Sequence, residues 1–93
     1  MIDVFDALAT ESRRLILDEL AERDGQALYE LCARLTMKHG VSLTRQAISQ
    51  HLDVLEAAGL VRSAREGRYK FHYVETGRLQ EAVRRWDKPT KEG

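Results

Sequence analysis

A segment in the middle of this 93-residue chain, residues 44–61, constrains the fold more than any other. Its residues with the spacing of one helical face are Ala47, Ile48, His51, Leu52 and Leu55. Thr44 precedes them as a favourable N-cap, and Gly59 follows as a residue that tolerates the left-handed conformation closing many helices. The opposite face carries Arg45, Gln46, Ser49, Gln50 and Asp53. Arg and Gln can each form two parallel hydrogen bonds to a base edge, and the major groove admits a helix. The segment is therefore predicted to be a DNA recognition helix.

Three more helices are predicted before this segment, because apolar residues recur there at helical spacing. The first is short and contains Ile2, Phe5, Leu8 and Ala9. The second spans about residues 11–23 and ends at the turn-forming pair Asp24 and Gly25. The third starts at about residue 27 and ends near Gly40, and its inward face is Leu28, Leu31, Cys32 and Leu35.

After the recognition segment the apolar pattern changes to the period of two that is typical of strands. Residues 60–65 and 69–73 are predicted strands, joined by a tight turn at Glu66 and Gly67. Alternation predicts that the aromatic residues of the second strand pack inward and that its cations point outward. A last helix follows Gly77. The fold class is thus α+β and mostly helical, a winged helix-turn-helix of four helices, a two-stranded hairpin wing and a C-terminal helix. Residues 1–87 form the predicted domain, and residues 88–93 form a polar tail.

The charge distribution favours nucleic acid locally, although the net charge is zero. Residues 44–73 hold three acids and five Lys or Arg residues, a balance of +2. We expect no secretory signal and no membrane span, and the lone Cys32 fits a reducing, cytoplasmic location. Motifs of nucleophilic, phosphate-cradling or metalloprotease sites are absent from the sequence, so we predict neither an enzyme nor a cofactor.

Several motifs resemble those of ArsR-type winged-helix transcriptional regulators. They are TESRRLIL at residues 10–17, LCARL at 31–35, QAISQHL at 46–52, AGLV at 58–61 and, in the wing, REGRY at 65–69. The resemblance covers about residues 3–86. It implies a homodimer joined through its first and last helices, which binds an inverted-repeat operator in double-stranded DNA and usually represses.

Two features depart from that family pattern. Many relatives bind metal through a Cys-x-Cys pair on the third helix, but Cys32 is followed by Ala33 and Arg34, and no histidine lies between residues 78 and 86. We therefore predict no metal site and a packing role for Cys32. The segment at 36–43 is longer than the usual link, and we expect it to extend the third helix by about one turn.

Specific roles follow for the polar residues. Gln46, Ser49 and Gln50 are predicted base readers, Thr44 faces a phosphate, and Arg45 binds a phosphate or guanine. His51 either packs against the core or reaches a phosphate, and packing is favoured. Arg65, Arg68 and Lys70 of the wing are predicted to contact the DNA backbone or minor groove, although they could be ordinary charges that protect a strand edge.

A dimer interface is predicted from large apolar residues on the two terminal helices. They are Ile2, Phe5, Leu79, Val83 and Trp86, and plain core packing is the alternative for them. Two other functions stay open. One is a winged-helix module for protein–protein interaction without DNA binding, and the other is a repressor that responds to metal or redox state. The sequence leaves open whether a small-molecule effector exists.

Overall fold

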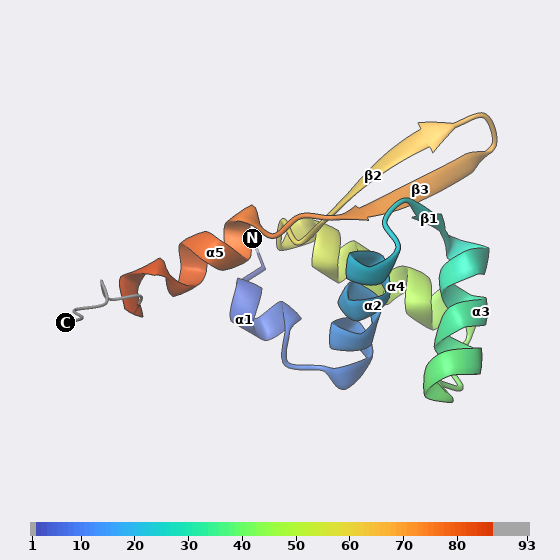
Figure 1. Cartoon of the computed structure of the whole chain (residues 1–93), viewed down its shortest axis with the longest axis horizontal. Helices are drawn as coiled ribbons and strands as arrows, with labels where there is room; N and C mark the ends of the chain where they lie inside the picture. Colours follow the sequence, from blue (N-terminus) through green and yellow to red (C-terminus); the bar gives the residue numbers. More distant parts are fainter. Residues whose placement is uncertain (1, 87–93) are drawn as a thin grey trace.

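A computed structural model describes residues 2–86 of the chain, so the predicted tail at 88–93 and the end of the predicted domain lie outside the described residues. Its elements in chain order are α1 (Val4–Ala7), α2 (Glu11–Glu22), β1 (Gln26–Ala27), α3 (Leu28–His39), α4 (Arg45–Ala57), β2 (Val61–Glu66), β3 (Tyr69–Val74), α5 (Gly77–Val83) and the 3₁₀ turn η1 (Arg84–Trp86). Helices α2, α3 and α4 form the body, the hairpin of β2 and β3 extends from it, and α5 projects beside α1 (Figure 1). The winged helix-turn-helix prediction is confirmed.

The core lies where the three central helices meet, because each contributes one apolar face. Its largest fully buried apolar side chains are Ile16, Leu20, Leu31, Leu35, Ile48, Leu55 and Leu60. Complete burial of such a side chain stabilises a fold by roughly 1.5–3 kcal/mol. The predicted inward residues Leu28 and Cys32 are half-buried and pack against this cluster, and so does the half-buried Leu15 of α2.

The first helix is shorter than the spacing of apolar residues predicted. Only Val4–Ala7 is helical, and its buried residues are Val4 and Ala7. Phe5 is 40% exposed, because a helix of four residues presents a single short stripe to the core. The third helix, in contrast, runs to His39 and closes at Gly40 in the left-handed conformation, as predicted.

The sheet contains a strand that the sequence pattern did not reveal. Strand β1 pairs antiparallel with β3, with Gln26 opposite His72, and the strand order is β1-β3-β2. Two residues are too few to display an alternating pattern. The Asp24–Gly25 turn helps to hold this edge, because Asp24 Oδ1 accepts a hydrogen bond from the Val74 amide at 2.8 Å.

The wing differs from the prediction in its turn and in its inward face. Glu66 pairs with Tyr69, so the two turn residues are Gly67 and Arg68 rather than Glu66 and Gly67. The predicted packing of the aromatic residues is wrong, because His72 is only 5% exposed whereas Tyr69 is 49% exposed. His72 instead lies on the buried side of β3, and alternation places the half-buried Phe71 and Tyr73 on the other side.

A buried carboxylate connects α2 with the end of α3. Glu19 is 1% exposed, and its oxygens lie 2.8 Å from Arg34 Nε, 2.9 Å from His39 Nε2 and 3.1 Å from Lys38 Nζ. Burial raises the pKa of Glu19, but hydrogen bonds from Arg34, His39 and Lys38 outweigh it and lower that pKa to about 2.

No helix between residues 2 and 86 is long and apolar enough to cross a membrane.

Candidate nucleic-acid interface

Helix α4 presents a polar face because both of its ends and its buried side are fixed. Thr44 Oγ1 accepts a hydrogen bond from the Ala47 amide at 3.0 Å, which confirms the predicted N-cap. At the other end, Gly59 has a φ of 78°. Ile48, Leu52 and Leu55 are buried. The remaining side of the helix is therefore held toward solvent.

The predicted base-reading residues lie on that solvent side. Arg45, Gln46 and Gln50 are exposed, and Ser49 is half-buried. The first turn of α4 contains no acidic residue, so the positive end of the helix dipole is not offset there. This arrangement can bind anions and can present amide and guanidinium groups to a groove of DNA.

His51 occupies the edge of the buried side and has a protein partner. Its Nδ1 lies 3.3 Å from Arg13 Nη1, and Arg13 also donates from Nε to the Ala7 carbonyl at 2.7 Å. Because arginine only donates, Nδ1 accepts and the proton of the neutral ring is on Nε2. Burial, together with the Arg13 charge, lowers the pKa of His51. These contacts fit the packed alternative for His51.

The three predicted wing cations lie near the tip of the hairpin. Arg65 and Lys70 face each other across the β2–β3 ladder, and Arg68 is in the turn. All three are exposed, and none forms a salt bridge within residues 2–86. The other wing arginine, Arg62, is occupied differently, because it pairs with Glu75 at 2.9 Å and stacks over the Tyr73 ring.

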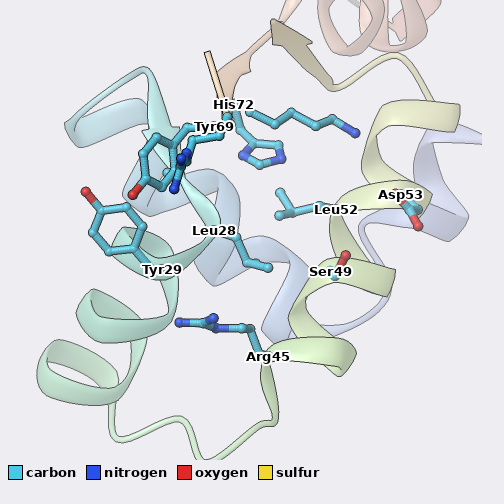
Figure 2. A pocket seen from close by; sticks show the side chains of 11 residues that line it. Leu28, Tyr29, Arg45, Ser49, Leu52, Asp53, Tyr69 and His72 are labelled. Carbon is cyan, nitrogen blue, oxygen red and sulfur yellow. The ribbon is translucent and has the colours of Figure 1, made fainter. Parts of the chain in front are cut away.

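Tertiary folding brings the helix and the wing together around one cavity of about 260 Å³. Arg45 and Ser49 of α4 line it, and so do Arg68 and Lys70 of the wing. Figure 2 shows Arg45 below the aromatic rings of Tyr29 and Tyr69, with Ser49 across the cavity on α4. The remaining predicted site residues, Thr44, Gln46, Gln50, His51 and Arg65, do not line this cavity.

Two residues at this cavity were not singled out from the sequence. Tyr29 is an exposed residue of α3, and its ring lies 5.8 Å from that of Tyr69. His72 also lines the cavity and is buried, although its position in an alternating strand predicted exposure. Neither could have been found from local pattern, because both depend on β3 lying beside α3.

Apolar side chains from both ends of the described chain meet at α1 and α5. The Phe5 and Trp86 ring centroids are 5.8 Å apart. Both residues are exposed, Trp86 by 58%, and so is Val83. Ile2 and Leu79 are partly buried against the core. Of the five residues predicted for a dimer interface, Ile2 and Leu79 thus pack against the core, and the other three are exposed.

Cys32 lies against the core, and burial raises the pKa of its thiol. Within residues 2–86 no three His, Cys, Asp or Glu side chains are grouped closely enough to hold a metal ion.

Comparisons with known proteins agree with this architecture. The model of a family described as a helix-turn-helix domain matches residues 8–64. The uncharacterized HTH-type transcriptional regulator YuzN of Bacillus subtilis is 49% identical over 83 residues, which are 89% of this chain and 90% of that protein. The structure of an ArsR-like transcriptional regulator from Rhodococcus has a TM-score of 0.73 at 35% identity, covering 88% of this chain and 71% of that one. A possible transcriptional regulator for arsenical resistance has a TM-score of 0.77 at 29% identity, covering 94% and 83%.

Proposed function

This chain belongs to the ArsR-type family of winged helix-turn-helix transcriptional regulators, and we propose that it acts as a homodimeric repressor on an inverted-repeat operator. It is a regulator of transcription and not an enzyme. The observation that carries the proposal is that Arg45 and Ser49 of the polar face of α4 and Arg68 and Lys70 of the wing line one cavity. Two separate elements of the fold thereby offer positive charge to a single partner.

Helix α4 is proposed to enter the major groove. Gln46, Ser49 and Gln50 read base edges, because amide and hydroxyl groups can both donate and accept there. Arg45 and the capped N-terminus beside Thr44 bind phosphate, where the helix dipole and unpaired amides attract anions. His51 supports the helix through Arg13 in this proposal rather than reaching a phosphate.

The wing is proposed to follow the neighbouring backbone or minor groove. Arg65, Arg68 and Lys70 form no salt bridge within the described part of the chain, so their charges are available to phosphates. Each phosphate contact releases counterions, and it therefore adds about one to the slope of log affinity against log salt concentration.

The dimer is proposed to form through α1 and α5. Phe5 of α1, Val83 of α5 and Trp86 of the following η1 are exposed apolar residues, and a second copy can bury them. Ile2 and Leu79 support the same surface from the core side. Two-fold symmetry would place the two recognition helices about 34 Å apart, which is one turn of B-form DNA.

A gel shift on the DNA upstream of the chain's own gene is the first test. Arg68→Ala should weaken binding to operator and random duplexes alike, and it should reduce the salt slope by about one. Arg23→Ala is the matched control, because Arg23 is an exposed arginine outside the proposed interface. An unchanged slope for Arg68→Ala would contradict the wing contact.

Gln50→Ala tests base reading separately. Its loss should be greater on operator than on random DNA, because a base contact contributes only where the correct base is present. Equal losses on the two duplexes would remove Gln50 from the base readers. No affinity for any duplex would favour a module for protein association instead.

A further inference from the structure

The cavity between α3, α4 and β3 has a floor and a rim of different chemistry. Ala27, Leu52 and His72 are buried and form the floor. The rim carries the exposed rings of Tyr29 and Tyr69, the cations already assigned to α4 and the wing, and the exposed carboxylate of Asp53. An apolar floor with one polar group, beneath a rim of aromatic and charged side chains, is typical of a small-molecule site.

His72 provides a hydrogen-bond acceptor at that floor. Its Nδ1 lies 2.9 Å from the carbonyl oxygen of Gln26, and since a carbonyl only accepts, Nδ1 holds the proton. In the neutral ring Nε2 then carries a lone pair. No hydrogen-bond partner of Nε2 is found in residues 2–86. Among these residues the one fully buried side-chain polar atom without a partner is Gln26 Oε1, so His72 Nε2 is not fully buried. Nε2 is therefore open to the cavity, and Figure 2 shows the imidazole pointing toward Leu52.

The rim favours a flat, negatively charged ligand. The Tyr29 and Tyr69 rings are 5.8 Å apart and inclined by 55°, so they offer aromatic surface to a planar group. Arg45, Arg68 and Lys70 bring three positive charges to the same opening and Asp53 brings one negative charge, so the opening keeps a positive balance. A volume of about 260 Å³ is just below the range for drug-sized ligands, which suits a compound with one ring.

We propose that this cavity binds a small planar aromatic acid and that the bound acid releases the protein from DNA. A hydroxyl or ring N–H of the ligand donates to His72 Nε2, the ring packs against Tyr29 and Tyr69, and the carboxylate pairs with the rim cations. The site would make the regulator responsive to an organic anion rather than to a metal.

The regulatory half rests on the proposed function. Arg45, Ser49, Arg68 and Lys70 line the cavity and are also the groups proposed to contact DNA. Ligand and DNA therefore compete for the same side chains, and each lowers the affinity of the other by the same factor. With free ligand at about ten times its Kd, the apparent Kd for DNA should rise roughly tenfold.

Binding is tested first on protein without DNA, with 4-hydroxybenzoate as the probe, at about pH 8 where an ordinary imidazole is neutral. Nuclear magnetic resonance should show a saturable shift of the His72 Nε2 signal, while the ring signals of His39 and His51 stay in place. Benzoate lacks the donor and should bind about fivefold more weakly. No saturable His72 shift at millimolar concentrations would overturn the proposal. So would inorganic phosphate reproducing every shift, which would mean that the rim binds only phosphate.

Two variants locate the site. Arg68→Gln should weaken 4-hydroxybenzoate about fivefold on DNA-free protein, because one ion pair at the rim is lost. Arg65→Gln is the matched control, since Arg65 is a wing cation that does not line the cavity. Leu28→Trp, which fills the cavity from its lining, should abolish binding. Equal effects of Arg68→Gln and Arg65→Gln would place the ligand elsewhere.

Competition is then measured by fluorescence anisotropy with operator DNA. A rise in the DNA Kd that follows 4-hydroxybenzoate saturation supports regulation, and an unchanged Kd with a saturated His72 shift overturns it. Failure of the protein to bind any duplex, with the His72 shift intact, would refute the proposed DNA function and leave the ligand site standing.

Discussion

Glu19→Gln is expected to destabilise the fold in a way that depends on pH. Glu19 is buried among Arg34, Lys38 and His39, and its pKa is lowered from 4.5 to about 2. One pKa unit corresponds to about 1.4 kcal/mol, so the ionised carboxylate contributes about 3 kcal/mol to the free energy of unfolding at neutral pH. The substitution keeps the shape of the side chain and removes this charge.

The sign of the pH dependence follows from a pKa that is lower in the folded state. The stabilisation by Glu19 is fully present above pH 4.5, and it is lost as the pH falls through about 2. The same linkage relation predicts that about 2 kcal/mol of it is lost between pH 7 and pH 3. The difference between the wild-type chain and Glu19→Gln should therefore shrink on acidification.

Urea unfolding, followed by far-ultraviolet circular dichroism at one fixed protein concentration, measures this difference at each pH. Glu22→Gln is the matched control, because Glu22 is an exposed carboxylate that pairs with the same Lys38. An exposed pair is worth about 0–1 kcal/mol, so this control should change little. Parallel pH profiles for the wild-type chain and Glu19→Gln between pH 7 and pH 3 would refute the assignment of a buried, ionised Glu19.

Three further outcomes are expected. Gly59→Ala should lower the free energy of unfolding by about 1–2 kcal/mol in urea titrations, because a left-handed φ of 78° strains alanine. Gly59→Ala should lower the free energy of unfolding more than Gly67→Ala. An added Cβ at residue 59 would lie 2.8 Å from Arg78 Cγ, whereas one at residue 67 would meet nothing within 4 Å. Equal losses of stability would show that the contact with Arg78 does not matter. Arg13→Gln should raise the pKa of His51, measured by nuclear magnetic resonance, because in the wild-type chain both burial and the Arg13 charge lower that pKa. An unchanged pKa would exclude the Arg13 charge as a cause. A His51 pKa below its ordinary value also means that protonation below about pH 6.5 destabilises the fold. Trp86→Ala should shift sedimentation from dimer to monomer, because it removes the most exposed ring on α5 and η1, and an unchanged dimer would move the interface elsewhere.

The candidate site was predictable where it depends on neighbours along the chain. Thr44 and Gly59 mark the ends of α4 because a cap and a left-handed glycine act within one helical turn. The period of 3.6 residues likewise identified the buried face with Ile48 and Leu52, and so left Gln46 and Gln50 on the exposed one. Pairs distant in sequence were not accessible in this way. The partnership of His51 with Arg13 and that of Tyr29 with Tyr69 both join separate elements.

The sequence alone determined the order of helices and hairpin and the solvent-facing side of α4, since these follow from hydrophobic period, capping and turn residues. The tertiary structure alone decided which face of β3 turns inward, that Glu19 is buried with its cations, and that Arg45 and Arg68 line one cavity. The alternation of residues 69–73 defines two faces but does not say which one packs. That choice depends on packing between elements distant in the chain. The β1–β3 pairs, for example, join residues some 45 positions apart, which no local hydrophobic period can reveal.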